Sequence, residues 1–481
     1  MIGHLSSAFT WLLLIGELVV LLRALLRPQR EPASRIAWSI AILVLPLVGA
    51  LFYLLVGEAR ISQRRRARFA AIDARLPRPS GDPEAARELG LGPYAAPFAL
   101  ARTVNGLPPT LGNRASLAAD NNAAIRGMVE DIDSAQHSVH MCFYIWLADR
   151  SGLAIKDALI RAAGRGVKVR ALADAMGSRQ FARSSHWQDL LAAGVDARQA
   201  LPVGGIVWTF IRGRVDLRNH RKALILDNRI AWCGSQNAAD PEFRIKWRFA
   251  PWVDLMTRWE GPVARHCQFL FASDWLAEHG DDLTDLFLPE PARPVAPPLH
   301  VTAQVIGTGP TLSYPAMTAC FAELIHAARH ELVVTTPYFV PDEQLLFALT
   351  SAARRGVRVA LVVPHRNDSR VVAGASRSYY RELIAAGVEV HEYRPGLLHA
   401  KTMVADGEVG LIGSANLDRR SFELNFENNI LFTDANLAGQ IRARQDEWIA
   451  QSERISAETV KGYNLFRRLW QNLSAMFSPL L

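Results

Sequence analysis

The feature that most constrains how this 481-residue chain folds is that its two halves follow one pattern. In each half an apolar run precedes an amphipathic stretch, an Arg-Gly-Val tripeptide and a second apolar run. The corresponding segments read ALIRAAGRGVKVRALAD at 158–174 and ALTSAARRGVRVALVVP at 348–364. Short apolar runs that alternate with helical periodicity are typical of βαβ units. The sequence therefore predicts an α/β protein with two similar domains, each built on a mostly parallel sheet.

Proline content and composition indicate where the domains begin and end. The stretch Leu288–Leu299 contains five prolines, which predicts a stiff connector between the halves. Residues 71–115 are rich in alanine, proline and glycine, as expected of a segment that leads into a domain. We expect a membrane anchor at 1–62, a linker and lead-in at 63–115, a first domain at 116–287, a Pro-rich linker at 288–300 and a second domain at 301–481 with an amphipathic carboxyl-terminal tail.

The amino-terminal end is both apolar and basic. Ile36–Val56 contains no charged residue and is long enough as a helix to span a hydrocarbon core of about 30 Å. Phe9–Leu26 is a weaker candidate because Glu17 and Arg23 interrupt it. We expect two transmembrane helices, at about 9–26 and 36–56, rather than a cleaved signal peptide, since the first residues lack a basic region. Five arginines within Arg60–Arg68 place the globular body on the cytoplasmic side by the positive-inside rule.

Composition excludes several classes of protein. Half of the residues are hydrophobic and 21% are charged, which excludes a largely disordered chain. The four cysteines are isolated, without a CxxC pair, which argues against a disulfide scaffold or a thiolate metal site. The net charge is +8, and most of it lies in the segment 1–70, which carries nine arginines and three glutamates. The nearly neutral remainder argues against a nucleic-acid partner.

One motif occurs in both halves, at equivalent places and with identical internal spacing. The two copies are NHRKALILDNRIAWCGSQN at 219–237 and LHAKTMVADGEVGLIGSAN at 398–416. The shared positions are His220, Lys222, Asp227, Gly234, Ser235 and Asn237 in the first copy and His399, Lys401, Asp406, Gly413, Ser414 and Asn416 in the second. A single His-x-Lys is commonplace, whereas the repeated pattern indicates a functional site.

The motif suits chemistry at a phosphodiester. Residues i and i+2 of a strand point to the same face, so His220 lies beside Lys222 and His399 beside Lys401. A histidine supplies a nucleophile or a proton, and an ammonium group neutralises charge on a phosphate oxygen. In-line displacement needs one group that attacks and another that protonates the leaving alcohol, so two halves would supply both histidines. We expect no metal and no cofactor, because no cluster with metal-ligand spacing occurs.

The remaining motif residues have supporting parts. We expect Asn237, Asn416, Ser235 and Ser414 to bind the substrate phosphate. Asp227 and Asp406 are included in the catalytic set as motif members, although Asp-Asn and Asp-Gly between apolar runs are typical of hairpin turns and favour a supporting role.

A carboxylate commonly orients a catalytic histidine. The candidates are Asp254, downstream of His220, and Glu427, downstream of His399, each in the same half as its histidine and on a plausible neighbouring strand. An ordinary surface or ion-pair carboxylate is the alternative for both.

The paired motif is similar to that of the phospholipase D superfamily, and within it the chain resembles the bacterial cardiolipin synthases. The resemblance covers nearly the whole chain. Its further segments are RPQREPASRIAWSIAILVLPLVGALFYLLVGEARIS (27–62), DLRNHRK (216–222), WVDLMTRWEGP (252–262), TPYFVPD (336–342) and GSANLDRRSFELNFE (413–427).

The resemblance implies two tandem phospholipase D-like α/β/α sandwich domains that form one pseudo-twofold active site. It implies a bacterial inner-membrane enzyme that acts on phosphatidylglycerol and other anionic phospholipids. In the implied reaction His220 attacks one phosphatidylglycerol and releases glycerol. A second phosphatidylglycerol then displaces the histidine and gives cardiolipin, with His399 as general acid and then base. The implied phosphate clamp is Lys222, Lys401, Asn237 and Asn416.

Three other functions remain open at this point. A hydrolytic phospholipase D would have the same site, a nuclease of the superfamily would need a basic groove, and a membrane scaffold would not need the motif. The sequence also leaves open whether the chain forms a homo-oligomer.

Overall fold

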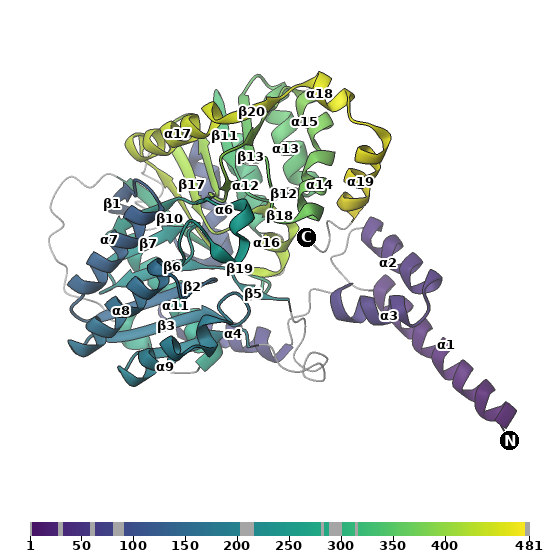
Figure 1. Cartoon of the computed structure of the whole chain (residues 1–481), viewed down its shortest axis with the longest axis horizontal. Coiled ribbons are helices and arrows are strands. Elements are labelled where there is room, and N and C mark those ends of the chain that lie inside the picture. Colours follow the sequence, from purple (N-terminus) through teal and green to yellow (C-terminus); the bar gives the residue numbers. More distant parts are fainter. Residues whose placement is uncertain are drawn as a thin grey trace. The chain divides into compact units, whose positions relative to one another are not determined.

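The structure, a computed structural model, describes residues 2–26, 32–57, 63–79, 91–202, 216–279, 283–287, 301–312 and 316–476 (Figure 1). Contacts divide the chain into two compact units. One is centred on Met1–Arg64, and the other, the catalytic body, comprises Arg65–Val203 and Leu217–Pro479. The Pro-rich linker expected at 288–300 lies outside the described residues.

The amino-terminal unit consists of one long helix and shorter helical segments around a small core. They are α1 (Ile2–Leu26), α2 (Pro32–Val44), α3 (Val48–Phe52) and a π-helical turn (Tyr53–Gly57). The helix expected over 36–56 is broken between α2 and α3, where Leu47 has a φ of 62°. Pro46 explains the break, because proline lacks an N–H and disfavours the helical conformation of the residue before it.

The predicted membrane helices at 9–26 and 36–56 are not supported. Within the described ranges, no helix combines the length and the apolar character that a bilayer crossing requires. For the second prediction the break is the reason, because the 13 residues of α2 rise only about 20 Å.

Among the residues that the structure describes, one mixed sheet of 16 strands runs through both halves of the catalytic body. Its first-half strands are β1 (Thr110–Leu117), β2 (Ser138–Phe143), β3 (Lys168–Asp174), β4 (Asp196–Ala200), β5 (Arg218–Asn219), β6 (Lys222–Leu226), β7 (Ile230–Gly234) and β9 (Met256–Glu260). Its second-half strands are β10 (Val301–Thr308), β11 (Glu331–Thr335), β13 (Arg358–Pro364), β14 (Glu389–Tyr393), β16 (Thr402–Ala405), β17 (Val409–Gly413), β19 (Asn425–Thr433) and β20 (Ser452–Ile455). Short strands outside it are β8 (Trp252–Val253), β12 (Phe339–Val340), β15 (Leu397–Leu398) and β18 (Leu417–Asp418).

The order of the strands reflects the internal repeat. The first half reads β1-β9-β7-β6-β2-β3-β4 from the centre outward, and the second reads β10-β19-β17-β16-β11-β13-β14. The halves meet where β1 pairs antiparallel with β10. The two predicted domains therefore share one sheet.

The prediction of a mostly parallel sheet was wrong. Only β2-β3-β4 and β11-β13-β14 run parallel along the main path of the sheet, as βαβ units require. Each copy of the motif instead forms an antiparallel hairpin, β6-β7 in the first half and β16-β17 in the second. The Asp-Asn and Asp-Gly dipeptides permit these tight turns, with positive φ at Asp227, Asn228, Asp406 and Gly407.

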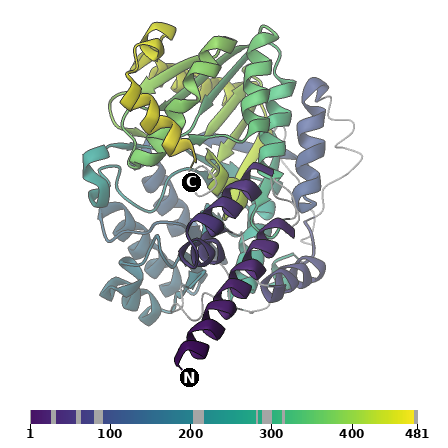
Figure 2. The ribbon, with the colours of Figure 1, turned by 90° about the vertical axis from the view of Figure 1, so that its right-hand side faces the viewer.

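Helices cover both faces of the sheet, so the body has α/β/α layers (Figures 1 and 2). The first half contributes α7 (Asn121–Ser134), α8 (Arg150–Gly164), α9 (Ser185–Ala192) and α11 (Pro262–His279). The second contributes α12 (Ala316–Ala327), α13 (Glu343–Arg354), α14 (Arg370–Ser378), α15 (Tyr380–Ala386), α16 (Arg419–Glu423), α17 (Ala435–Ala450), α18 (Ala457–Lys461) and α19 (Leu465–Met476).

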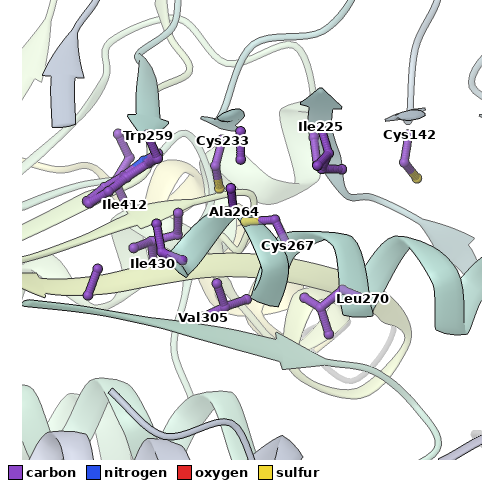
Figure 3. Close-up of a cluster of buried hydrophobic side chains, with 14 of the residues drawn as sticks. Cys142, Ile225, Cys233, Trp259, Ala264, Cys267, Leu270, Val305, Ile412 and Ile430 are labelled. Carbon is purple, nitrogen blue, oxygen red and sulfur yellow. The ribbon is translucent and has the colours of Figure 1, made fainter. Parts of the chain in front are cut away.

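A large hydrophobic cluster joins the two halves. Figure 3 shows α11 contributing Ala264, Cys267 and Leu270 to a cluster that also contains Ile225 of the first half and Ile430 of the second. Because these side chains pack in one buried cluster, the relative placement of the halves is stabilised by core packing as well as by strand pairing.

The described parts of 63–115 contain more secondary structure than expected of a linker and lead-in. It contains α4 (Gln63–Arg75), α6 (Ala95–Asn105) and the beginning of β1. Phe98 and Ala101 of α6 are buried in a core made with second-half helices. The lead-in to the first half is therefore part of the core of the second.

Candidate active site

The two motif histidines follow short strands that cross between the halves. β5 of the first half pairs with β19 of the second, and the His220 N–H donates to the Phe426 carbonyl at 2.9 Å. In the same way β15 of the second half pairs with β8 of the first, and the His399 N–H donates to the Val253 carbonyl at 2.7 Å. Each histidine is therefore held against the opposite half.

The crossing decides which carboxylate orients which histidine. His220 Nδ1 lies 3.0 Å from both carboxylate oxygens of Glu427, and His399 Nδ1 lies 2.6 Å from Asp254 Oδ1. Asp254 and Glu427 are thus paired with histidines, but the expected pairing within each half was wrong. Because the carboxylates engage Nδ1, both histidines present Nε2 for chemistry.

The motif serines contact these carboxylates rather than an open phosphate site. The Ser235 hydroxyl donates to Asp254 Oδ1 at 2.7 Å and accepts the Leu255 N–H at 3.0 Å. The Ser414 hydroxyl donates to Glu427 and accepts the Asn428 N–H at 2.9 Å. Since each hydroxyl proton is committed to a carboxylate, the prediction that Ser235 and Ser414 donate to phosphate is not supported.

Both motif lysines are buried beside their histidines. Lys222 Nζ donates to the His220 carbonyl, and Lys401 Nζ donates to the His399 carbonyl, each at 2.6 Å. Burial lowers the pKa of Lys222 to about 8 and the pKa of Lys401 to about 7, against the opposing effect of Asp254 and Glu427. Each ammonium retains donors for an oxyanion.

The same electrostatics act on the histidines and carboxylates. Burial lowers the pKa of His220 and of His399 to about 4. Burial alone would raise the pKa of Asp254, but His399, Lys401 and Ser235 outweigh it and lower that pKa to about 2. The pKa of Glu427 is likewise lowered despite burial, chiefly by His220. The carboxylates are therefore ionised and the histidines neutral near pH 7.

The two copies of the motif influence each other electrostatically. Beyond burial, the charge of Lys401 lowers the pKa of His220, and the charge of Lys222 lowers the pKa of His399. Lys222 also lowers the pKa of Lys401. A charge shifts a pKa in this way only when it lies near the titrating group, so the two motifs belong to one site.

The motif asparagines lie just after the hairpins. Asn237 Oδ1 accepts the Ile145 N–H at 3.1 Å, and Asn416 Nδ2 donates to Asp418 Oδ2 at 3.3 Å. Both asparagines are buried, Asn237 shortly after β7 and Asn416 shortly after β17. The role expected for them in binding phosphate stays a prediction.

Asp227 and Asp406 lie at the far ends of the hairpins. The register pairs Lys222 with Phe143, whereas Asp227 accepts N–H groups at the opposite end of β2, from Gln136, His137 and Ser138. Asp406 accepts the N–H groups of Arg329, His330 and Glu331 and the Tyr94 hydroxyl. The placement of both aspartates in the catalytic set was wrong, because their oxygens are used to hold the turn to the neighbouring strand.

We expect the Asp406→Asn substitution to reduce stability without reducing turnover. Asparagine tolerates the positive φ, but its amide cannot accept all four donors, so the free energy of unfolding should fall by about 1–3 kcal/mol. Urea denaturation and the specific activity of the folded protein measure the two effects, and Glu408→Gln, on the same hairpin, is the matched control. An inactive but normally stable Asp406→Asn protein would contradict the structural role.

Several residues of the site were missed in the sequence. Arg221 donates to Asp274 Oδ1 at 2.8 Å and to the Glu427 carbonyl at 3.2 Å, which links the histidine segment to α11 and β19. The Tyr144 ring lies 4.9 Å from His220, and the Trp252 ring 4.6 Å from His399. A charged residue inside the apolar motif is a signal for Arg221, but no local pattern indicates the aromatic pair.

No metal cluster was expected from the sequence. In the part of the chain that the structure describes, no group of three or more His, Cys, Asp or Glu side chains is arranged to hold a metal ion. The arrangement instead provides two neutral imidazoles, two ionised carboxylates and two buried amines, which suits nucleophilic and acid–base steps at an anionic centre.

Comparison with known proteins agrees with this arrangement. A family model described as "Cardiolipin synthase, PLD-like domain" matches residues 128–275 and 321–448, the two halves of the body. Cardiolipin synthase A of Yersinia pseudotuberculosis (strain IP 31758) is 36% identical over 100% of this chain and 99% of its own length. The chain belongs to the cardiolipin synthase family. The resemblance seen in the double motif is thereby confirmed.

Further comparisons match other or overlapping parts of this cardiolipin synthase family member. Cardiolipin synthase A of Pectobacterium carotovorum is 36% identical over 98% of this chain and 97% of its own. A "Phospholipase_D-nuclease N-terminal" model matches residues 18–58. The crystal structure of phosphatidylserine synthase from Haemophilus influenzae has a TM-score of 0.58 at 15% identity, covering 79% of this chain and 97% of its own. Together with the family model that matches both halves, this likeness supports the tandem phospholipase D-like fold.

Proposed function

We propose that the protein transfers a phosphatidyl group between two phosphatidylglycerol molecules and thereby forms cardiolipin and glycerol. The observation that carries the proposal is the crossed site, in which both histidines are oriented by buried carboxylates and lie within the field of both lysines. A transfer through a covalent intermediate needs this pair of imidazoles at one phosphorus atom.

The first step forms a phosphatidyl-histidine. By the family resemblance we assign His220 as nucleophile: its Nε2 attacks phosphorus, and the bond between phosphorus and the glycerol oxygen breaks. His399 donates a proton to the departing glycerol, since the bound phosphate anion raises the pKa of an adjacent histidine. Lys222 and Lys401 stabilise the charge on the non-bridging oxygens, and Asn237 and Asn416 assist them.

The second step reverses the roles. His399 accepts the proton of the terminal hydroxyl of the second phosphatidylglycerol, whose oxygen attacks phosphorus. The bond between phosphorus and His220 Nε2 breaks, which restores the enzyme and releases cardiolipin. Glu427 and Asp254 stabilise the imidazolium forms of His220 and His399 respectively, as their ionised state allows.

We also propose that the amino-terminal unit attaches the enzyme to the bacterial inner membrane, with the body on the cytoplasmic face. Trp11, Leu12 and Ile15 of α1 are exposed, as suits contact with lipid. Arg64 and Arg66 of α4 are exposed and would lie against the anionic inner leaflet, whereas Arg65 and Arg68 bond to α11.

Product analysis tests the reaction. We expect the purified full-length protein in phosphatidylglycerol vesicles to yield cardiolipin and glycerol in equal amounts. A hydrolase would yield phosphatidic acid, and that outcome would contradict the proposal. A second set of vesicles that also contains phosphatidylethanolamine identifies which lipids serve as acceptor.

The pKa values predict the pH dependence of kcat/KM. Raising the pH removes the proton that His399 must donate, and through about 7 and then about 8 it also removes the charges of Lys401 and Lys222, so the rate should fall. Below about 4 the rate should fall because His220 becomes protonated and loses its nucleophilic lone pair. A rate profile in phosphatidylglycerol vesicles, corrected for vesicle binding, measures both limbs. A profile that stays flat through the alkaline range would contradict the role of the lysines.

A further inference from the structure

The carboxyl-terminal helix α19 has its polar side inside and its apolar side outside. Its buried residues are Gln471 and Ser474, which face α14. Its exposed large side chains are Leu465, Phe466, Leu469, Trp470, Leu473 and Met476. Phe466 is 82% exposed and Leu469 is 53% exposed. A helix of a globular protein shows the opposite arrangement, so the outer side of α19 is suited to an apolar partner.

A second segment with the same character lies on the 3₁₀ turns Arg244–Phe249, of sequence RIKWRF. Ile245 is 51% exposed and Trp247 is 67% exposed, and three cationic residues alternate with the apolar ones. The Arg248 guanidinium lies 5.5 Å from the centre of the Trp247 ring. Exposed aromatic and aliphatic side chains between cations are typical of segments that enter the interface of a membrane.

The two segments are connected by contacts through α14. Lys246 forms an ion pair with Asp368, a residue that lies just before the start of α14. Asp368 also accepts a hydrogen bond from the Tyr338 hydroxyl at 2.8 Å. α14 in turn lies beside α19, where Gly374 allows Ser474 to approach closely (Figures 1 and 2). The segment 244–249 therefore contacts the start of α14, and α14 contacts α19.

A hollow between α14 and α19 adds positive charge to this area. It has a volume of about 520 Å³ and is lined by Arg370, Arg377 and Arg467 together with Trp470. Arg377 is partly neutralised, because its Nε donates to Glu392 at 2.8 Å. The remaining arginines beside an exposed tryptophan suit the phosphate of a lipid headgroup.

This area also adjoins the candidate active site. The segment 244–249 leads directly into β8, whose Trp252 ring stacks on Phe243 at 3.9 Å and lies 4.6 Å from the His399 ring. Two residues later, Asp254 orients His399. Trp247 therefore lies shortly before Trp252 and Asp254 in the chain, and these two residues contact the acid–base histidine.

We propose that the exposed residues of 244–249 and α19, with the arginines between them, form a docking surface that rests on an anionic phospholipid bilayer. The apolar side chains enter the interface, and Arg248, Arg370 and Arg467 bind phosphate groups. Charge complementarity selects a lipid bilayer over an apolar protein partner, because the surface carries cations among its apolar groups and faces a substrate that is itself anionic. The inference rests on the proposed function only in its choice of lipid.

Site-directed labelling of the full-length protein tests the docking surface. All four native cysteines are buried, so Trp247→Cys and Leu469→Cys can each be labelled with an environment-sensitive fluorophore. The control is Leu191→Cys on α9, an exposed leucine outside the surface. Each protein is placed in phosphatidylcholine vesicles and in phosphatidylcholine–phosphatidylglycerol vesicles, with brominated acyl chains as quencher.

We expect blue-shifted emission and bromine quenching at positions 247 and 469, stronger with phosphatidylglycerol and weaker at high salt, but neither at position 191. Replacing Arg370 and Arg467 by glutamine should weaken docking to anionic vesicles by about fivefold for each charge. Labels at 247 and 469 that behave like the control would overturn the proposal. A blue shift without bromine quenching would also overturn it, since protein would then cover the surface.

The readout separates this inference from the proposed reaction. Quenching at 247 and 469 without cardiolipin formation would leave the docking surface standing and refute the reaction. Cardiolipin formation without quenching at either position would support the reaction and refute the docking surface.

Discussion

Replacing either His220 or His399 by alanine is expected to reduce cardiolipin formation by about 10⁴-fold or more. Each substitution removes a group that forms or breaks a bond at phosphorus and that its carboxylate holds in place. The measurement is the rate of cardiolipin formation by the purified variant in phosphatidylglycerol vesicles.

A matched control exists for this experiment. His365 Nδ1 lies 2.7 Å from Glu392 Oε2, so it has the same histidine–carboxylate contact outside the site. We expect His365→Ala to keep its activity. If either of the active-site variants retained wild-type lipid products, the enzymatic assignment itself would be lost.

The covalent adduct distinguishes the two histidines. Rapid quenching during turnover, followed by mass spectrometry of peptides, should find the phosphatidyl group on the peptide that contains His220. An adduct on His399 would mean that His399 is the nucleophile and His220 the general acid and base.

Substituting the orienting carboxylates should have the next largest effect. In Glu427→Gln and Asp254→Asn the amide keeps the size of the side chain but no longer stabilises an imidazolium, so kcat should fall by about 10²–10⁴-fold. The crossed geometry makes a sharper prediction. Glu427 should couple to His220, and Asp254 should couple to His399, although each pair lies in different halves.

Double-mutant cycles on the free energy of unfolding measure this coupling. We expect coupling energies of about 0.5–3 kcal/mol for His220/Glu427 and His399/Asp254. The pairs within one half, His220/Asp254 and His399/Glu427, are the controls and should be nearly additive. Coupling within the halves instead of between them would contradict the crossing of β5 and β15.

Much of the site was predictable because its signals are local. The i, i+2 spacing of His220 and Lys222 follows from strand periodicity, and its repetition around His399 and Lys401 indicated a second copy. The turn dipeptides indicated the role of Asp227 as well, even though that residue was also placed in the catalytic set.

The rest depends on how distant segments pack. No spacing along the chain reveals that β5 leaves its own half to pair with β19, so the partner of His220 was sought at Asp254, in its own half, rather than in the other half. The parallel sheet was overestimated because the repeated Arg-Gly-Val pattern describes only the outer strands. A continuous membrane helix over 36–56 was predicted because the hydropathy of this segment was given more weight than the effect of Pro46 on the backbone.

The exchange of β5 and β15 makes the two copies mutually dependent. If the chain were cut between its halves, each fragment would carry an imidazole without its anion and an anion without its imidazole. Neither fragment would be a smaller enzyme, and mixing would have to rebuild both crossings at once. Deletion of either copy would therefore remove the function of both.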